Sequence, residues 1–173
     1  LATMDRLNVE YDLLSWEGDI LRLDFWETAF DLLKEAGVLF LQPTGPQAGC
    51  WVMEIREDRP DDSTDPRYKV VVRSDGTVTY VGKDIAYQFW KFGLIGKNFK
   101  FHPYLTQRSG RTLWTTATEG DGNHHTSPRF GHASAVFNVI DTRQAYLQKL
   151  LRQALTAAGH NEQAEKSVHF SYE

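Results

Sequence analysis

Near its C-terminal end the sequence carries a strand pattern, a helix pattern and a second strand pattern in succession. Ala135–Ile140 is a continuous apolar run, suited to a buried parallel strand. From about Thr142 to Ala158 apolar residues recur at helical spacing, and Gly159 closes the stretch. Ser167–Tyr172 is a further strand candidate. This alternation predicts a mixed α/β fold, with Ala135–Ile140 parallel in a central sheet and the helix packed on one face.

A β-hairpin is the clearest local signal in the middle of the chain. Tyr68–Ser74 is rich in β-branched residues, Asp75-Gly76 is a preferred turn, and Thr77–Val81 reads as the returning strand. A helix is expected to follow from Asp84 to Ile95.

Further elements are expected upstream. One long helix is predicted from Asp19, as its N-cap, to about Glu35, with Gly37 as a left-handed residue after its end. Val38–Gln42 and Cys50–Ile55 read as two short paired strands. Between Lys97 and His132, short strands are expected at Phe99–Phe101 and Thr112–Thr118, separated by Gly, Ser, Asn and Pro.

Composition fits one soluble domain. The chain has 173 residues, 41% hydrophobic and 24% charged, and no run approaches the roughly 18 apolar residues of a spanning helix. A single cysteine, Cys50, excludes an internal disulfide, so a cytoplasmic protein with a buried structural thiol is expected. The net charge of −4 means that any contact with nucleic acid is local. The aromatic residues fall at helix or strand spacing, which favours core packing over base stacking.

No metal site is expected. The histidines His102, His124, His125 and His132 have spacings that fit no closed zinc pattern. The sequence also lacks the phosphate-binding G-x-x-x-x-G-K-[ST] and G-x-G-x-x-G loops.

Polar residues at predicted strand ends are the candidates for chemistry. Tyr80 closes the hairpin and Asp84 opens the next helix, while Asp141 and Gln144 follow the strand Ala135–Ile140. Open α/β sheets bind ligands beyond the carboxyl ends of their strands. The structural alternative is that Asp84 is a helix cap and Asp141 a turn residue.

Three segments, in order, resemble the arginyl-tRNA synthetase family of class I aminoacyl-tRNA synthetases. The first is Asn8-Val9-Glu10-Tyr11-Asp12 with Trp16-Glu17-Gly18-Asp19, similar to the segment after the family's HIGH motif. The second, from Asp75 to Ala86, matches D-G-x-x-x-Y-x-x-x-D-x-A. The third is Ile140-Asp141-Thr142-Arg143-Gln144, which matches I-D-x-R-Q, and His169-Phe170 resembles the strand that leads to the KMSKS loop.

The resemblance implies a Rossmann-like nucleotide-binding domain and the activity of arginine–tRNA ligase. Such an enzyme activates L-arginine with ATP and Mg²⁺ and transfers it to tRNA(Arg). The resemblance places the substrate guanidinium on Tyr80 and Asp84 and the substrate's α-amino side near Gln144, and it implies that the three residues converge. A planar guanidinium needs a carboxylate and a second acceptor fixed in its plane, so these residue types suit arginine.

The resemblance spans nearly all of Asn8 to Glu173, so residues 1–173 are expected to form a partial catalytic domain. It thins over 43–67 and 97–132, which are expected to be insertions or loops. Neither the HIGH nor the KMSKS sequence occurs, and the chain stops within an apparent strand at Glu173. The expectation is an internal fragment that is inactive alone, holds no tightly bound cofactor and contains no catalytic residue; which residues contact ATP stays unknown. One alternative is a non-catalytic synthetase-like module that binds tRNA or a protein partner, and a second is a different class I synthetase or another α/β nucleotidyl transferase.

Overall fold

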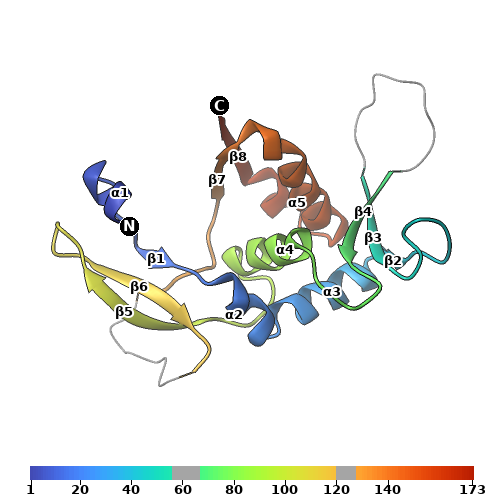
Figure 1. Ribbon diagram of the computed structural model, residues 1–173, viewed down its shortest axis with the longest axis horizontal. Helices are drawn as coiled ribbons and strands as arrows, with labels where there is room; N and C mark the ends of the chain where they lie inside the picture. Colours follow the sequence, from blue (N-terminus) through green and yellow to red (C-terminus); the bar gives the residue numbers. More distant parts are fainter. Residues whose placement is uncertain (56–66, 120–127) are drawn as a thin grey trace.

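The computed structural model describes residues 1–55, 67–119 and 128–173, and shows helices in the middle with three small sheets around them (Figure 1). The helices of this part are α1 (Ala2–Arg6), α2 (Glu17–Arg22), α3 (Phe25–Glu35), α4 (Tyr80–Lys91), the 3₁₀ turn η1 (Thr142–Gln144), α5 (Ala145–Ala157) and α6 (Asn161–Glu165). The strands are β1 (Leu13–Leu14), β2 (Leu39–Leu41), β3 (Trp51–Ile55), β4 (Arg67–Val72), β5 (Lys100–Thr106), β6 (Thr112–Ala117), β7 (Val136–Asp141) and β8 (Ser167–Tyr172). The predicted mixed α/β class is confirmed.

The C-terminal βαβ unit forms as predicted. β7 and β8 pair in parallel along their whole length, from Val136↔Ser167 to Asp141↔Tyr172, and η1, α5 and the short α6 connect them. The expectation that this strand is buried on both faces in a central sheet is wrong for the described residues. There β7 pairs with β8 alone, and Phe137 and Val139 are 62% and 67% exposed. The reason is that α5 covers one face only, the face that carries Val136 and Asn138.

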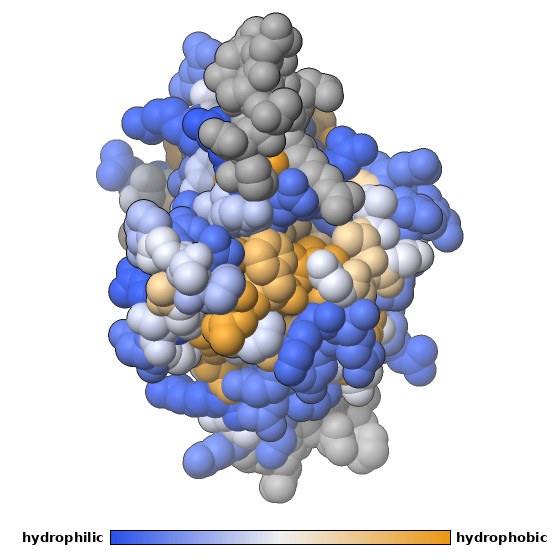
Figure 2. Space-filling view, turned by 90° about the vertical axis from the view of Figure 1, so that its right-hand side faces the viewer, coloured by the Kyte–Doolittle hydropathy of each residue, from blue (hydrophilic) through white to orange (hydrophobic). Residues whose placement is uncertain are grey.

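An antiparallel sheet, in the order β2–β3–β4, lies on the right-hand side of the molecule in Figure 1. Its β2–β3 pair, with Phe40 opposite Val52, confirms the two paired strands predicted there. Figure 2 shows apolar side chains exposed in the middle of this side of the molecule, with hydrophilic residues around them. Leu41 at the end of β2 is 50% exposed.

The predicted hairpin ends sooner than expected. The turn at Asp75-Gly76 forms, and the Arg73 amide donates to the Thr77 carbonyl at 2.9 Å. The prediction of a returning strand over Thr77–Val81 is wrong, because the pairing there is a single bridge, Val72↔Val78.

Helix α4 begins at Tyr80, four residues before the predicted start at Asp84, and it ends at Lys91 instead of Ile95. The earlier start puts Val81, Ile85 and Phe89 on one face, where all three are fully buried. Burial of that face against α3 therefore outweighs the strand propensity of Val78 and Val81.

The single helix predicted over Asp19–Glu35 is two helices. The helical conformation is interrupted at Asp24, which adopts a left-handed conformation with φ 55°, and α3 starts at Phe25. Asp19 is not an N-cap: it is buried in α2, and its carboxylate accepts a 2.8 Å hydrogen bond from the Thr116 hydroxyl. Gly37 has φ 67° after the end of α3, as predicted.

Helix α4 is the centre of the core. It packs against α3 on one side and α5 on the other, as Figure 1 shows. Most of the aromatic residues around it are core residues, as expected: the Trp90 ring lies 4.7 Å from the Phe99 ring, and that ring lies 4.5 Å from Phe25. The side chain of Gln88 donates to Ser167 at 3.0 Å, which ties α4 to β8. The candidate site residues on α4, Tyr80 and Asp84, are therefore carried by a helix that is packed on both sides.

Candidate functional site

One face of α4 carries the polar and aromatic residues that the core leaves open. Tyr80, Asp84, Tyr87 and Lys91 follow one another at spacings of four, three and four residues, so they line one side of the helix; we call them the α4 stripe. The two predicted arginine-pocket residues on α4, Tyr80 and Asp84, are thus one helical turn apart. The sequence suggested that Tyr80 ends a strand and that Asp84 starts the helix. In the structure Tyr80 starts the helix and Asp84 lies inside it.

Asp84 is the charged centre of the stripe. Its side chain is half-buried, and among the described residues none donates a hydrogen bond to its carboxylate. Burial, and next the negative charge of Glu17, raise the pKa of Asp84 to about 6, against the opposing charges of Lys91 and Lys83. Lys83 itself forms an ion pair with Glu17. Asp84 lies in the second turn of α4, so the alternative that it is a helix cap is wrong.

The C-terminal part of the stripe is held by neighbouring segments. The Ser15 hydroxyl, just after β1, donates to the Tyr87 hydroxyl at 2.8 Å. The Lys91 ammonium lies 4.6 Å from the centre of the Tyr87 ring and donates to the Asn138 side-chain oxygen at 3.1 Å. Burial lowers the pKa of Lys91, and the charge of Asp84 acts in the opposite direction. Lys91 is therefore a half-buried cation on the same helical face as Asp84.

Tyr80 at the N-terminal end of the stripe also has partners. Its hydroxyl forms a short hydrogen bond with the Tyr146 hydroxyl, near the start of α5. The Lys69 ammonium, on β4, lies 5.4 Å from the centre of the Tyr80 ring and 5.1 Å from that of Tyr146. Strand β4, helix α4 and the start of α5 thus meet at Tyr80, and of these α5 is distant in sequence.

Gln144, the third predicted pocket residue, is the last residue of η1 and is exposed. It lies two residues before Tyr146, so the tyrosine pair brings its segment to the N-terminal end of the α4 stripe. Within the described part of the chain, no hydrogen bond joins Gln144 to Asp84 or to Tyr80. Asp141 is a structural residue: its carboxylate accepts from the Arg143 amide at 2.9 Å and also pairs with the Arg143 guanidinium.

Sequence reasoning missed several polar residues that contact the stripe or belong to it, among them Tyr87, Lys91, Lys69 and Tyr146. The helical spacing of Tyr87 and Lys91 from Asp84 was a usable signal, because it places them on one face. Lys69 and Tyr146 had no such signal, because their contacts with Tyr80 depend on how β4 and α5 pack.

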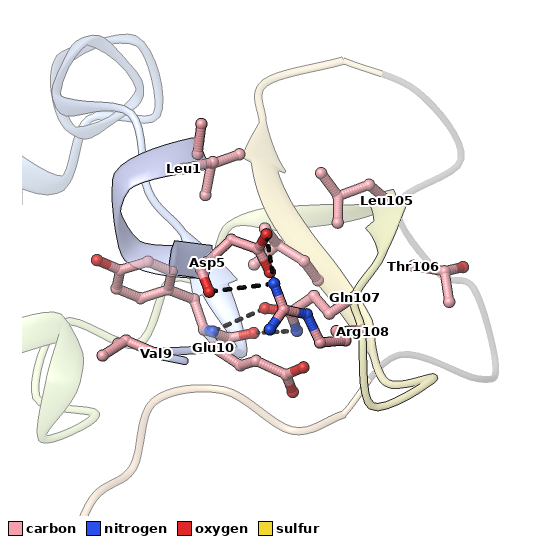
Figure 3. A pocket seen from close by; sticks show the side chains of 11 residues that line it. Leu1, Asp5, Val9, Glu10, Leu105, Thr106, Gln107 and Arg108 are labelled. Carbon is pink, nitrogen blue, oxygen red and sulfur yellow. Dashed lines mark hydrogen bonds and ion pairs between the residues drawn. The ribbon is translucent and has the colours of Figure 1, made fainter. Parts of the chain in front are cut away.

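A pocket of about 420 Å³ lies elsewhere, between the first residues of the chain and the β5–β6 hairpin (Figure 3). Its polar side chains are occupied with one another. Arg108 pairs with Asp5 at 2.9 Å, and the Gln107 amide donates to the Tyr11 carbonyl at 2.7 Å and accepts from the Tyr11 amide at 2.8 Å. These contacts fasten the hairpin to the segment before β1, and they leave little chemistry for a ligand.

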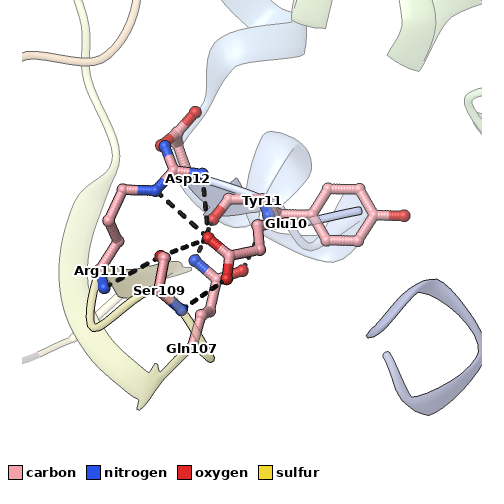
Figure 4. A network of polar contacts seen from close by, with 6 residues as sticks. All are labelled: Glu10, Tyr11, Asp12, Gln107, Ser109 and Arg111. Atoms are coloured by element: carbon pink, nitrogen blue, oxygen red, sulfur yellow. Dashed lines mark hydrogen bonds and ion pairs between the residues drawn. The ribbon is translucent and has the colours of Figure 1, made fainter. Parts of the chain in front are cut away.

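A polar network continues this attachment (Figure 4). The Glu10 carboxylate accepts from the Ser109 amide at 2.8 Å and pairs with Arg111 at 3.1 Å, and Arg111 also reaches Asp12 at 3.2 Å. The hydrogen bonds from Ser109 and the charge of Arg111 hold the pKa of Glu10 below its usual value. The region 97–132, expected to be an insertion, thus joins β1 through β6 in a parallel pair; that it is an insertion stays a prediction.

Part of the two regions expected to be insertions, including His124 and His125, lies outside the described residues. Elsewhere in the chain, His102 contacts the Glu119 carbonyl at 3.2 Å, and no group of three His, Cys, Asp or Glu is placed to hold a metal ion. The described residues contain no helix that is both long and apolar enough to cross a bilayer.

Comparison with known proteins identifies close relatives of the whole chain. It is 42% identical over 172 residues to an arginine–tRNA ligase of Deinococcus radiodurans, covering 99% of this chain and 27% of the relative. An arginine–tRNA ligase of Thermus thermophilus is 41% identical over 173 residues, with 100% of this chain and 28% of the relative covered. One of Pyrococcus abyssi is 37% identical over 173 residues, with 100% and 26% covered. No protein-family model matches the chain.

The fold agrees with these sequence relatives. The solved structure of Thermus thermophilus arginyl-tRNA synthetase matches with a TM-score of 0.79 and 39% identity, over 99% of this chain and 28% of that chain. This chain spans about a quarter of the length of the curated relatives it matches.

Proposed function

Since this chain is homologous over its whole length to the arginyl-tRNA synthetases, we propose that it forms the amino-acid-binding part of the catalytic domain of such an enzyme. The complete protein then acts as an arginine–tRNA ligase. It converts L-arginine and ATP into arginyl-adenylate and pyrophosphate, and then transfers the arginyl group to tRNA(Arg) in the cytoplasm.

The observation that carries the choice of substrate is the Asp84 carboxylate on the α4 stripe. It is half-buried on a rigid helix, and no described side chain donates a hydrogen bond to it. A carboxylate in such a place is stabilised when a cationic ligand arrives, because the ligand supplies the charge and the donors that burial removed. A guanidinium fits this position, with Tyr80 one turn away as a second oxygen.

Gln144 completes the proposed pocket from the other side. It is exposed at the end of η1, and its segment is joined to Tyr80 through Tyr146. Its side-chain amide has an acceptor and donors, and it can approach the polar end of the amino acid. The three residues bind and orient arginine, and none of them is proposed to take part in bond making.

The ATP site is proposed to lie on other parts of the complete protein. The HIGH and KMSKS sequences are absent from these 173 residues, and the described residues offer no cluster for a metal ion. For the same reason, this chain alone is expected to form no arginyl-adenylate.

The test is ATP–pyrophosphate exchange and aminoacylation of total tRNA by the protein expressed from the complete gene. Arginine should support both reactions, and lysine and glutamine neither. Exchange driven by another amino acid would show a different synthetase. A complete protein that binds tRNA but supports no exchange with any amino acid would be a non-catalytic module instead. ATP–pyrophosphate exchange by the 173-residue chain alone would overturn the proposal that the ATP site lies on other parts of the complete protein.

A further inference from the structure

The contact between Tyr80 and Tyr146 links two parts of the proposed pocket. Tyr80 is the first residue of α4 and is 48% exposed, while Tyr146 follows Gln144 by two residues near the start of α5. Their hydroxyl groups share a short hydrogen bond. An exposed tyrosine at a helix start has freedom about two side-chain torsions, so this bond restricts where the Tyr80 oxygen lies.

Lys69, on β4, contacts both tyrosines. Its ammonium lies 5.4 Å from the Tyr80 ring centre, 5.1 Å from the Tyr146 ring centre and 3.5 Å from the Tyr146 hydroxyl. Such positions are favourable for a cation over aromatic faces. The side of Tyr80 that faces β4 also borders an open pocket of about 580 Å³, so the ring is not wedged in place by core packing there.

We propose that Tyr146, supported by Lys69, is a positioning residue for the arginine site: it holds the Tyr80 hydroxyl where that oxygen can receive the substrate guanidinium. This inference rests on the proposed function. Tyr146 acts through Tyr80 and touches no reacting atom.

The hydrogen-bond roles are consistent with this arrangement. The bond with Tyr146 lowers the pKa of Tyr80, and the same bond raises the pKa of Tyr146. Either hydroxyl can be the donor in this bond, and the proposal takes Tyr146 as the donor. A phenol oxygen has two lone pairs, so accepting from Tyr146 leaves one for a guanidinium, which can only donate.

The experiment is a double-mutant cycle in the complete enzyme, with Tyr146→Phe, Tyr80→Phe and the pair. Each substitution removes one hydroxyl and keeps the ring. Tyr146→Phe alone should raise KM for arginine about twofold to tenfold, as expected for one hydrogen bond, and leave kcat and KM for ATP unchanged. In the Tyr80→Phe background the same substitution should have no further effect, because the hydroxyl that it positions is gone.

Matched controls separate positioning from general damage. Tyr104→Phe, on the exposed part of β5, should leave KM for arginine unchanged. Lys69→Met should shift KM for arginine in the same direction as Tyr146→Phe, and Lys69→Arg, which keeps a cation over the rings, should restore it.

The outcomes distinguish the two proposals. A wild-type protein that does not use arginine refutes the proposed function and this inference with it. A wild-type enzyme that uses arginine, with KM unchanged in Tyr146→Phe, overturns the inference alone. So does a KM effect of Tyr146→Phe that persists in full when Tyr80 is already phenylalanine, because the two residues then act independently.

Discussion

The Lys91 ammonium on α4 donates a 3.1 Å hydrogen bond to the side-chain oxygen of Asn138 on β7. Asn138 in turn donates to Gln148 on α5 at 2.9 Å. This chain of polar contacts joins the helix that carries Asp84 to the βαβ unit that carries Gln144. The two halves of the proposed arginine pocket are therefore connected by buried or half-buried hydrogen bonds as well as by apolar packing.

Lys91→Met is expected to destabilise the protein by about 1–3 kcal/mol, because it leaves the buried Asn138 oxygen without its donor. Lys97→Met serves as the control. Lys97 is exposed, its ion pair with Asp24 is a long 3.8 Å, and the Asp24 carbonyl to which it donates at 3.1 Å is on an exposed residue that water can reach, so the change should stay within about 0.5 kcal/mol. Urea unfolding followed by tryptophan fluorescence measures both. Equal stability of Lys91→Met and wild type would show that the contact adds nothing.

Asp84→Asn should impair the use of arginine far more than the use of ATP. The amide keeps the shape of the side chain but loses the charge that pairs with the guanidinium, and charged hydrogen bonds contribute roughly 1.5–3 kcal/mol. The expected loss in kcat/KM for arginine is about tenfold to hundredfold. Steady-state exchange kinetics in the complete enzyme, with arginine varied at saturating ATP, measure it. Unchanged kinetics would remove Asp84 from the pocket.

The KM for arginine should rise as the pH falls through about 6, the pKa of Asp84. A protonated Asp84 cannot pair with the guanidinium, which stays charged at every pH in question. One pH unit below that pKa, KM should be about tenfold higher than at pH 8, since only the ionised fraction binds. Asp84→Asn should abolish this dependence, and a wild-type KM that is flat between pH 5 and 8 contradicts the assignment.

Asp84 should also make the unliganded protein less stable as the pH rises from about 4 to about 6. Its pKa is raised in the folded state, so the folded protein holds the proton more tightly than the unfolded chain, and this advantage disappears once the pH exceeds the folded pKa. Asp84→Asn should therefore stabilise the protein at pH 8, on the order of 1 kcal/mol after allowance for solvent screening, and have little effect at low pH. Thermal unfolding of the wild type and of Asp84→Asn at pH 4.5 and 8 tests the direction of this effect. If Asp84→Asn is not more stable than the wild type at pH 8, the prediction is wrong.

Two helical glycines should respond in opposite ways to alanine. A Cβ at Gly82, in α4, would lie 2.8 Å from Val78 and 3.0 Å from the Trp26 ring, so Gly82→Ala should destabilise the protein by about 1–3 kcal/mol. A Cβ at Gly18, in α2, would meet nothing within 4 Å, and Gly18→Ala should be neutral or stabilising. Melting temperatures compare the two, and similar values would argue against the tight α3–α4 packing.

Local patterns predicted much of the fold. The turn at Asp75-Gly76 forms, because glycine accepts the φ of 84° found there at little cost. The strand–helix–strand unit at the C-terminal end also forms, since its periodicity and length suit a parallel crossover. Element boundaries were less predictable. Val78 and Val81 favour a strand, yet Val81 is buried in α4, where contact with α3 decides the conformation.

The sequence by itself determined the α/β class, the similarity to arginyl-tRNA synthetases and the candidate residues Tyr80, Asp84 and Gln144, because these follow from short-range spacing and from motifs in a recognisable order. Only the tertiary structure decided that Tyr80 and Asp84 share one helical face, that Lys69 and Tyr146 meet at Tyr80, and that Asp84 is buried enough for its pKa to rise to about 6. Contacts between residues dozens of positions apart, and the desolvation of a carboxyl, depend on how helices and strands pack, and no local pattern in the chain encodes that packing.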